Sequence, residues 1–199
     1  MTMNSSEKKL TQKDLMGIFW RSFRQDAVWN FERQQNLGSA YTMSRVVGKL
    51  YEDDKEKRAR ALQRHVDFMA ITPHLSTLLY GILAAMEEEN ANNSDFDESS
   101  ISAVRASLRG PIAGIGDSLL WGTVRIIAAG IAISFSQNGS ILGPLLFLLI
   151  INVPCMILRY VCLFKGYELG TSFFKKVLDS GIMDTVTYVA SAIGLMVIG

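Results

Sequence analysis

Residues 25–38 of this 199-residue chain hold side chains suited to a polyhydroxylated ligand. Gln25, Trp29, Glu32 and Asn36 follow at steps of four, three and four residues, which predicts one shared helical face, and Gln35 flanks it. Carboxylate and amide groups match sugar hydroxyls, which both donate and accept hydrogen bonds. A neighbouring Trp can pack on the apolar face of a pyranose ring. The alternative is a polar helix face exposed to water or paired with another subunit.

A second group of candidates follows the glycine-rich stretch GPIAGIGD at residues 110–117. Glycines at this density, together with a proline, predict a break in regular helix. Transporters use such breaks to direct backbone dipoles at a substrate inside the membrane. Asp117 and Trp121 follow the break at helical spacing, with Arg125 four residues further on. Because an Asp in apolar surroundings is costly, we expect it to face substrate. The alternative is an Asp that caps a helix at the membrane interface.

The remaining titratable residues form no catalytic constellation in the sequence. His65 and His74 lie nine residues apart without clustered acidic or Cys ligands, which favours ordinary helix histidines over a metal pair or phosphate acceptors. Residues 87–89 (EEE) are interpreted as a solvated helix end. The sequence shows no nucleophile–base pair, phosphate-binding loop or dinucleotide fingerprint. We therefore expect no catalytic residue, cofactor or metal site.

Charge and glycine divide the chain into two parts. Residues 1–109 carry 30 of the 39 charged side chains, whereas residues 110–199 carry nine and hold twelve of the 16 glycines. This division predicts a charged helical part over 1–109, cytoplasmic or interfacial, and a membrane part over 110–199. The net charge of +1 argues against a nucleic-acid-binding protein, which would carry a basic face or tail.

The second part has the composition of membrane-spanning sequence. No charged residue occurs from Ile126 to Leu158, and the turn-like residues 137–140 (QNGS) interrupt this run. The segments Ile112–Phe135 and Gly139–Leu158 are each long enough to cross a bilayer as a helix. A third apolar segment, Thr185–Gly199, is shorter, so the membrane part is expected to be incomplete at its C-terminal end.

The charges also predict an orientation. The first residues, MTMNSSEKKLTQKD, lack the apolar core of a signal peptide, so we expect a cytoplasmic N-terminus. The loop over 159–184 carries four Lys or Arg and the turn at 137–140 carries none, which places that loop in the cytoplasm as well. A multi-pass protein of the cytoplasmic membrane is consistent with both observations.

The first part is predicted to be helical. Thr11 and Asp14 resemble a capping box that precedes an amphipathic run with apolar residues at helical spacing. That run is rich in aromatic residues and suits either the membrane interface or the core of a bundle. Two further helices are expected on either side of Pro73, and a short one is expected to end before Gly110. The fold class is therefore all-α: an integral membrane protein with an amphipathic helical N-terminal part and a glycine-rich, broken-helix membrane part.

Three segments carry a resemblance to a known family. They resemble the IID component of the mannose/fructose/sorbose family of bacterial phosphotransferase systems, in order and over essentially the whole chain. The motifs are FWRSF at 19–23, WNFERQQNLG at 29–38 and GPIAGIGDSLLWG at 110–122.

The resemblance implies a membrane subunit that pairs with a IIC subunit to form the sugar-translocating unit of a hetero-oligomer. Separate IIA and IIB components would carry the phosphate, so no phosphohistidine is expected in this chain. The implied partners are IIC, IIA/IIB, a hexose or amino-sugar substrate and membrane lipid. Glu32, Gln35 and Asn36 are predicted to face the sugar path, with Asp117 and Trp121 beside or opposite them.

This chain departs from the family pattern at a few positions. Phe31 stands where the family usually has Tyr, Gln34 where it has Met, and Ile71 precedes Thr72 where it has Asn. Family members also continue for several tens of residues beyond the last apolar segment, so this chain is expected to be shortened at its C-terminus. The alternative function is a structural subunit that folds and orients the IIC partner without contacting sugar.

Overall fold

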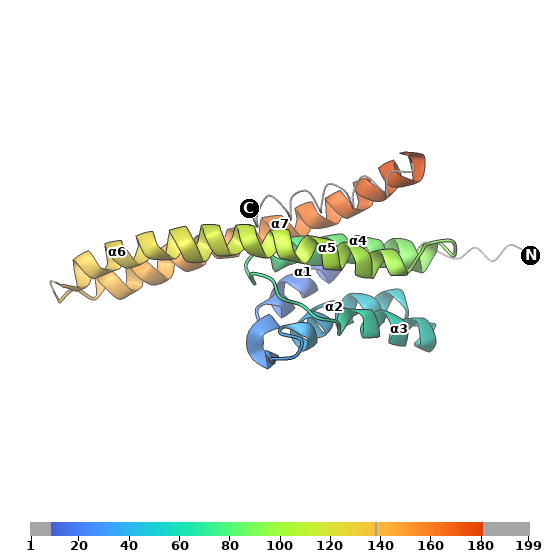
Figure 1. Ribbon diagram of the computed structural model, residues 1–199, viewed down its shortest axis with the longest axis horizontal. Helices are drawn as coiled ribbons and strands as arrows, with labels where there is room; N and C mark the ends of the chain where they lie inside the picture. Colours follow the sequence, from blue (N-terminus) through green and yellow to red (C-terminus); the bar gives the residue numbers. More distant parts are fainter. Residues whose placement is uncertain (1–8, 138, 181–199) are drawn as a thin grey trace, which may run out of the picture.

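The computed structural model describes residues 9–137 and 139–180, in which the regular secondary structure is entirely helical (Figure 1). The all-α prediction is confirmed. The predicted third apolar segment, Thr185–Gly199, lies outside the described residues. The elements in chain order are α1 (Gln12–Ser22), the 3₁₀-helix η1 (Gln25–Val28), α2 (Asn36–Leu50), α3 (Lys55–His65), α4 (Ser76–Asn92), α5 (Ser99–Gly116), the π-helix η2 (Asp117–Val124), α6 (Arg125–Ser136) and α7 (Leu142–Ser180).

Several local predictions are confirmed. The backbone N–H of Thr11 donates to the Asp14 carboxylate at 2.9 Å, so the capping box begins α1 as expected. The helices α3 and α4 are separated around Pro73. A turn joins α6 to α7, and Gly139 adopts a positive φ of 72° there, which a residue without Cβ accepts without strain.

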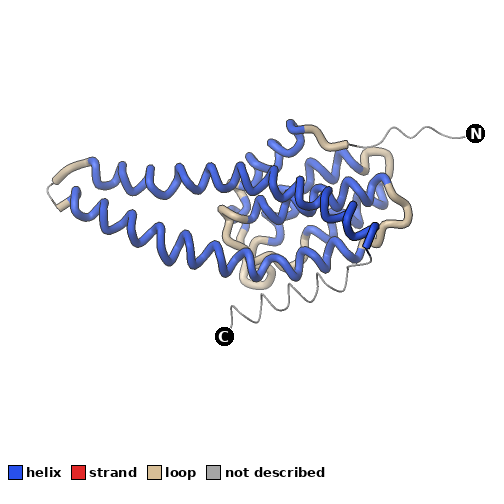
Figure 2. The backbone as a smooth tube through the Cα atoms, turned by 90° about the horizontal axis from the view of Figure 1, so that it is seen from above, coloured by secondary structure: helices blue, strands red, loops and turns tan. Residues whose placement is uncertain are grey.

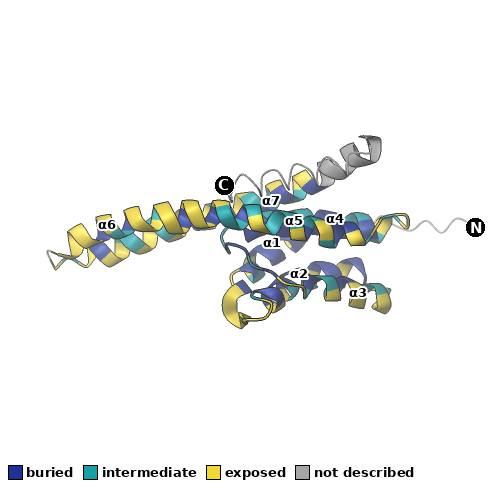
Figure 3. Ribbon diagram, in the orientation of Figure 1, coloured by how far each residue is buried: buried dark blue, intermediate teal, exposed yellow. Residues whose placement is uncertain are grey.

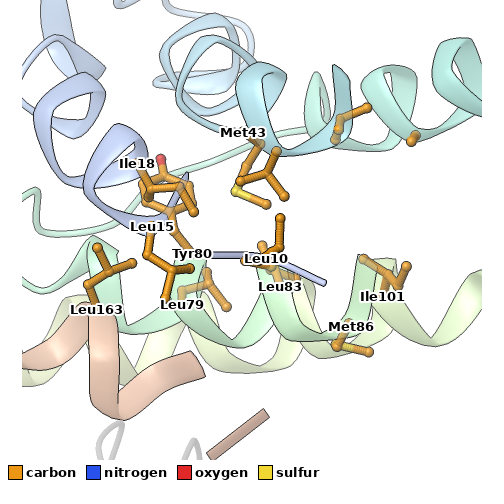
Figure 4. Packing of buried hydrophobic residues seen from close by; sticks show 14 of the residues in the cluster. Leu10, Leu15, Ile18, Met43, Leu79, Tyr80, Leu83, Met86, Ile101 and Leu163 are labelled. Atoms are coloured by element: carbon orange, nitrogen blue, oxygen red, sulfur yellow. The ribbon is translucent and has the colours of Figure 1, made fainter. Parts of the chain in front are cut away.

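The helices α1 to α5 and the part of α7 beyond residue 158 pack around one hydrophobic core, and we call this bundle the head. The helices α1, α2, α4 and α5 contribute to it, as does the part of α7 beyond residue 158 (Figure 4). The helix α4 is central, since its apolar side chains are buried nearly all around the helix. Fully buried members of the core include Ile18, Met43, Leu79, Tyr80, Leu83, Met86, Ile101 and Leu163.

The helices α4 and α7 approach each other at backbone distance. A Cβ added to Gly81 would lie 2.3 Å from the Leu163 carbonyl oxygen, and one added to Gly166 would lie 2.1 Å from that of Leu78. One turn further along α7, a Cβ at Gly170 would come within 2.6 Å of the Ala85 Cβ. Small residues four apart allow such close helix packing. This contact fixes the long helix α7 to the centre of the head.

A helical hairpin extends from the head (Figure 2). It consists of η2, α6 and residues 142–158 of α7, and we use the word hairpin for these residues. The helical stretches Ser99–Ser136 and Leu142–Gly170 have mean hydropathies of 1.6 and 2.2 over their most apolar windows, of which only 17% and 11% is buried. Most of the hairpin surface is exposed (Figure 3). Long apolar helices left uncovered by their own chain suit a lipid or subunit environment.

The predicted break at residues 110–117 is not present, and this expectation was wrong. The helix α5 passes through Gly110 and Pro111 and continues directly into η2 at Asp117. The irregularity takes the form of a π-helix, which retains backbone hydrogen bonding. In apolar surroundings a real break would leave peptide groups without partners, and that costs more than the single hydrogen bond that proline removes. The short helix that was expected to end before Gly110 instead continues to Gly116 as α5, which crosses the expected division at residue 109.

The expected solvated helix end at residues 87–89 was also wrong. The Glu87 side chain is fully buried and accepts hydrogen bonds from Tyr51 Oη at 2.7 Å and Arg64 Nε at 2.8 Å. The His65 Nε2 atom lies 2.9 Å from Glu87 Oε1. Glu88, the next residue, accepts a 2.9 Å hydrogen bond from Tyr167 of α7. These carboxylates join α2, α3 and α7 to α4.

Opposing effects set the pKa values of the buried pair His65 and Glu87. Burial lowers the pKa of His65, more than its contact with Glu87 raises it. Burial also acts to raise the pKa of Glu87, but the hydrogen bonds from His65 and Arg64 outweigh it and hold that pKa below its ordinary value. The pair is therefore a neutral imidazole that donates to a carboxylate, whose counter-charge is the Arg64 guanidinium.

Replacing Glu87 with Ala is expected to lower the free energy of unfolding by about 3 kcal/mol, because Tyr51, His65 and Arg64 would lose their buried acceptor and Arg64 would keep only the partly exposed Glu98. Glu89→Ala on the same helix serves as the control. Glu89 is partly exposed and accepts only a 3.4 Å contact from Asn93, so its loss should cost no more than about 0.5 kcal/mol. Denaturant titration of the purified protein in detergent measures both values. Equal effects of the two substitutions would contradict the stabilising role of Glu87.

Stability is also expected to fall as the pH drops below about 6.5, the ordinary pKa of histidine. The unfolded chain takes up a proton on His65 there, whereas the folded chain, with its lowered pKa, does not. The loss can reach about 1.4 kcal/mol per pH unit. Burial lowers the pKa of His74 as well, so the wild type also loses stability through that residue. The contribution of His65 is the difference in stability loss between the wild type and His65→Gln. Unfolding curves at pH 7.5 and 5.5 should show a smaller loss for the variant, and parallel curves would disprove this origin.

Candidate functional site

Three segments enclose a cleft where the hairpin leaves the head. They are the loop over 23–35, the non-helical chain over 69–75 and the junction of α5 with η2. The cleft has a volume of about 370 Å³. Its lining residues are Asp26, Trp29, Gln34, Gln35, Ala70, Ile71, Thr72, Pro73, Ala113, Asp117 and Trp121.

Gln35 holds the first wall of the cleft in place, which is the loop over 23–35. Its Oε1 atom accepts hydrogen bonds from Gln25 Nε2 at 2.9 Å and from the Ile71 backbone N–H at 3.1 Å. Its Nε2 atom donates to Asp26 Oδ1 at 2.6 Å. One buried amide therefore joins the loop over 23–35 to the chain over 69–75 and directs the Asp26 carboxylate.

This loop lies directly on α2. A Cβ at Gly38 would stand 1.9 Å from the Gln25 carbonyl oxygen, so only glycine permits the contact. Asn30 and Gln34 exchange backbone hydrogen bonds of 3.0 and 2.9 Å, and Gln34 adopts a φ of 56°. These bonds close the loop between η1 and α2.

The predicted continuous helix over residues 25–36 is therefore wrong. The chain forms one 3₁₀ turn and a closed loop before α2 begins at Asn36. Helical spacing predicts a shared face only if the helix is uninterrupted. The loop brings Gln25 and Gln35 together by hydrogen bonding instead.

Arginines of α5 hold the second wall, which is the chain over 69–75. Arg105 donates to the backbone carbonyls of Arg64 and Asp67, the latter at 2.6 Å. Arg109 donates to the Phe68 carbonyl at 2.7 Å and lies over the Phe68 ring at 4.6 Å. These contacts fix the chain that leads into residues 69–75 and therefore the edge of the cleft.

The third wall, which is the junction of α5 with η2, contacts the second wall through Thr72. Its hydroxyl lies 2.7 Å from Asp117 Oδ1 and 3.0 Å from the Ala113 carbonyl oxygen. Gly116 permits this approach, because a Cβ there would lie 2.5 Å from the Thr72 Cβ and Oγ1 atoms. The glycine that was predicted to break the helix instead lets α5 contact Thr72.

Trp121 separates this cleft from a second one of about 290 Å³. Its ring lies 6.0 Å from that of His74, and Arg125 lies over it at 5.0 Å. Burial, and secondarily the charge of Arg159, lowers the pKa of His74. The second cleft is lined by His74, Leu120, Trp121, Val124, Arg125, Phe147, Ile151, Asn152 and Cys155.

The structure brings together some of the predicted site residues. Gln35, Asp117 and Trp121 line the same cleft although 82 positions separate Gln35 from Asp117. Glu32 and Asn36 are not among its lining residues. The Glu32 side chain is 79% exposed and pairs with Arg33 at 3.2 Å, while Asn36 is buried and donates to the Val66 carbonyl.

Sequence reasoning did not assign Asp26 or Thr72 to the site. Asp26 is next to Gln25 in the sequence, but helical spacing placed it outside the predicted face that Gln25 shares with Trp29. Thr72 stands before Pro73, a position biased toward extended backbone. A hydroxyl residue before a proline was the available signal, and it did not indicate contact with residue 117.

The cleft has the chemistry of a carbohydrate site. Asp26 and Asp117 offer carboxylate oxygens and Gln34 offers an amide, while Trp29 and Trp121 are 45% and 44% exposed. Carboxylates and amides satisfy hydroxyl groups, and exposed indole rings pack on the C–H faces of sugar rings. An apolar ligand would leave the second oxygen of each carboxylate without a partner from the ligand.

Known proteins match this chain over nearly all of its length. A family model described as the PTS system mannose/fructose/sorbose family IID component matches residues 9–199. The mannose-specific EIID component of Escherichia coli (strain K12) is 37% identical over 198 residues, which is 100% of this chain and 70% of that protein. The fructose permease IID component of Bacillus subtilis (strain 168) is 39% identical over 193 residues, which is 97% of this chain and 70% of that protein.

A solved structure shows the same fold. The cryo-EM structure of the mannose transporter ManYZ in complex with microcin E492 contains a chain that superimposes with a TM-score of 0.92 at 38% identity. The match covers 97% of this chain and 70% of that chain.

Gly116→Ala is expected to destabilise the protein by about 1–3 kcal/mol, because the new methyl group must displace Thr72 from α5. Gly110→Ala is the matched control on the same helix. A Cβ at Gly110 meets no atom within 4 Å, and alanine favours helix by about 0.5–1 kcal/mol. Thermal unfolding in detergent compares the two variants. A Gly116→Ala protein as stable as Gly110→Ala would contradict the close contact with Thr72.

Proposed function

Because this chain belongs to the mannose/fructose/sorbose family of phosphotransferase IID components, we propose that its cleft at the head–hairpin junction receives the transported sugar. The chain is a membrane subunit of a sugar-transporting phosphotransferase complex. The observation that carries the proposal is the convergence of two carboxylates, two amides and two exposed tryptophans from two segments distant in the sequence on one cleft.

The substrate class follows from these groups. Asp26, Asp117 and Gln34 would bind hydroxyls of a hexose or amino sugar, and Trp29 and Trp121 would stack on its ring. Gln35 would donate its remaining Nε2 hydrogen to the sugar while it holds Asp26 in place. Asp117 is a costly residue at the start of a membrane-spanning helix, and substrate contact accounts for its presence.

Glu32 and Asn36 remain predicted contributors. Glu32 is exposed on the loop that carries Trp29, where it is open to sugar or to a partner. Asn36 accepts a 2.8 Å hydrogen bond from Asn30 and would act by holding that loop in place.

The dimensions of the hairpin support a membrane placement. From Asp117 to Ser136 the helical rise is about 29 Å, and from Leu142 to Arg159 it is about 26 Å. The hydrocarbon core of a bilayer is about 30 Å thick. We propose a multi-pass protein of the bacterial cytoplasmic membrane with its N-terminus in the cytoplasm, in which residues 1–109 form the cytoplasmic or interfacial part and the membrane part lies within residues 110–199. The cleft would then lie at the cytoplasmic boundary, where a sugar emerges.

The exposed hairpin supports a partner inside the membrane. PTS IID components work with IIC and with IIA/IIB components in one complex. We propose that the IIC subunit packs on the exposed apolar residues of α6 and α7. Arg125 stands about midway along the hairpin, where a cation needs a counter-charge or water, and it would face this partner. Lipid would cover the remaining hairpin surface.

Asp117→Asn keeps the shape of the side chain and removes its charge. A hydrogen bond to a charged group is worth about 1.5–3 kcal/mol, so sugar affinity should fall about 10- to 100-fold. Trp29→Ala should lower affinity independently, because Trp29 comes from a different wall of the cleft. The measurements are sugar binding and uptake by the full chain reconstituted in vesicles with its IIC partner, alongside the yield of the complex.

Asp95→Asn is the matched control, since Asp95 is an exposed carboxylate in the loop between α4 and α5. It should leave binding, uptake and yield unchanged. Wild-type uptake by Asp117→Asn at normal membrane levels would overturn the proposed contact. A loss of complex yield with unchanged sugar affinity in the complex that remains would favour a structural subunit that orients IIC without contacting sugar.

A further inference from the structure

A third cleft lies between α1 and α2 and is lined by basic side chains. It has a volume of about 420 Å³ and takes no part in the sugar site. Its lining residues are Lys13, Met16, Gly17, Trp20, Arg21, Arg24, Tyr41 and Arg45. Four cations and no carboxylate therefore line one concave surface.

Tyr41 holds two of these cations close together. Arg21 donates through Nη1 to the Tyr41 carbonyl oxygen at 3.0 Å and to Ser44 Oγ at 2.6 Å, and its guanidinium lies 4.7 Å from the centre of the Tyr41 ring. Arg24 donates through Nη1 to Tyr41 Oη at 2.7 Å. Two like charges fixed around one side chain repel each other unless an anion lies between them.

The other two cations complete the cleft. The Arg45 side chain lies across α1 at Gly17, where an added Cβ would come within 2.7 Å of Arg45 Cδ. Lys13 is exposed on the same side of α1. The nearest carboxylate along that helix, Asp14, is bound by Lys49 at 2.5 Å. Among the described residues, no ion pair neutralises any of the four cations.

The position of this cleft favours a lipid as its ligand. The C-terminal end of α1 contacts α7 where the uncharged run of the hairpin stops, since the Phe19 ring lies 6.0 Å from that of Tyr160 and Arg159 lies over Phe23 at 4.6 Å. Trp20 lines the cleft, is 62% exposed and stacks with Phe23. Exposed Trp and clustered Lys or Arg are typical of the membrane–water boundary.

We propose that Lys13, Arg21, Arg24 and Arg45, arranged around Tyr41, bind the phosphate group of an anionic phospholipid, with Trp20 beside its glycerol and upper acyl region. Arginine forks match phosphate oxygens, and the cations of the cleft offset the lipid charge. The proposal rests on the membrane placement of the hairpin but not on the sugar site. A failure of the sugar site would therefore leave this lipid site standing.

Quenching of Trp20 by brominated lipid tests the proposal. The full chain with its IIC partner is reconstituted in vesicles that contain brominated phosphatidylglycerol in unlabelled phosphatidylcholine, and in vesicles with the label reversed. The Trp20 signal is the difference between the wild type and Trp20→Phe. At equal mole fraction, brominated phosphatidylglycerol should quench this signal at least twofold more than brominated phosphatidylcholine.

Two double variants separate the cleft from general surface charge. Lys13→Gln with Arg45→Gln removes two cations that make no hydrogen bond among the described residues, so the helices should stay packed and the lipid preference should disappear. Lys55→Gln with Lys57→Gln removes the same charge from α3 and should keep the preference. Equal quenching by the two lipids in the wild type, or an unchanged preference in the Lys13/Arg45 variant, would overturn the proposal.

A soluble phosphate is the competing source of the same chemistry. Inorganic phosphate is added at an ionic strength matched with chloride. Retention of the lipid preference under both salts supports a lipid site. A preference lost with phosphate but kept with chloride would assign the cleft to a soluble phosphate and overturn the lipid assignment, as would binding of a phosphorylated carrier protein that excludes the lipid.

Discussion

The close approach of α4 and α7 is the constraint on which the rest of this structure depends. α7 runs from the tip of the hairpin into the head, and α4 is the centre of the head core (Figures 1 and 4). Gly81, Gly166 and Gly170 let the two backbones meet. Because the contact leaves no room for a side chain, α7 has little freedom to tilt or slide relative to the head. The cleft at the foot of the hairpin therefore keeps a fixed geometry.

Polar side chains serve two different purposes around this frame. Glu87 is buried, and Tyr51, Arg64 and His65 saturate its oxygens, so it links helices and has no free hydrogen-bonding capacity for a ligand. Asp117, in contrast, has one described side-chain partner, Thr72, and lies at the wall of an open cleft. A carboxylate that is held on one side and open on the other can bind a ligand without reorganising, which lowers the entropic cost of binding.

Charge is arranged in layers along the long axis of the molecule. The hairpin is uncharged from residue 126 to 158, the sugar cleft lies at its foot, and the basic cleft between α1 and α2 lies where α1 contacts Tyr160. This order follows from solvation, since charges are costly in hydrocarbon and favourable where water and headgroups begin. Under the two proposals, the same boundary carries both a sugar site and a phosphate site, lined by different residues of the head.

The sequence by itself determined the features that depend on neighbouring residues. The capping box at Thr11, the separation of α3 from α4 and the uncharged run over 126–158 are local patterns, because the hydrogen bonding and solvation that produce them depend on neighbouring residues. Tertiary structure decided whether Glu87 would be solvated, whether residues 25–36 would form one helix, and which residues would meet Asp117. These outcomes depend on partners that are distant in sequence: Arg64 is 23 positions from Glu87, and Thr72 is 45 from Asp117. The free energy of burying a polar group depends on such partners, and residue spacing along the chain does not encode them.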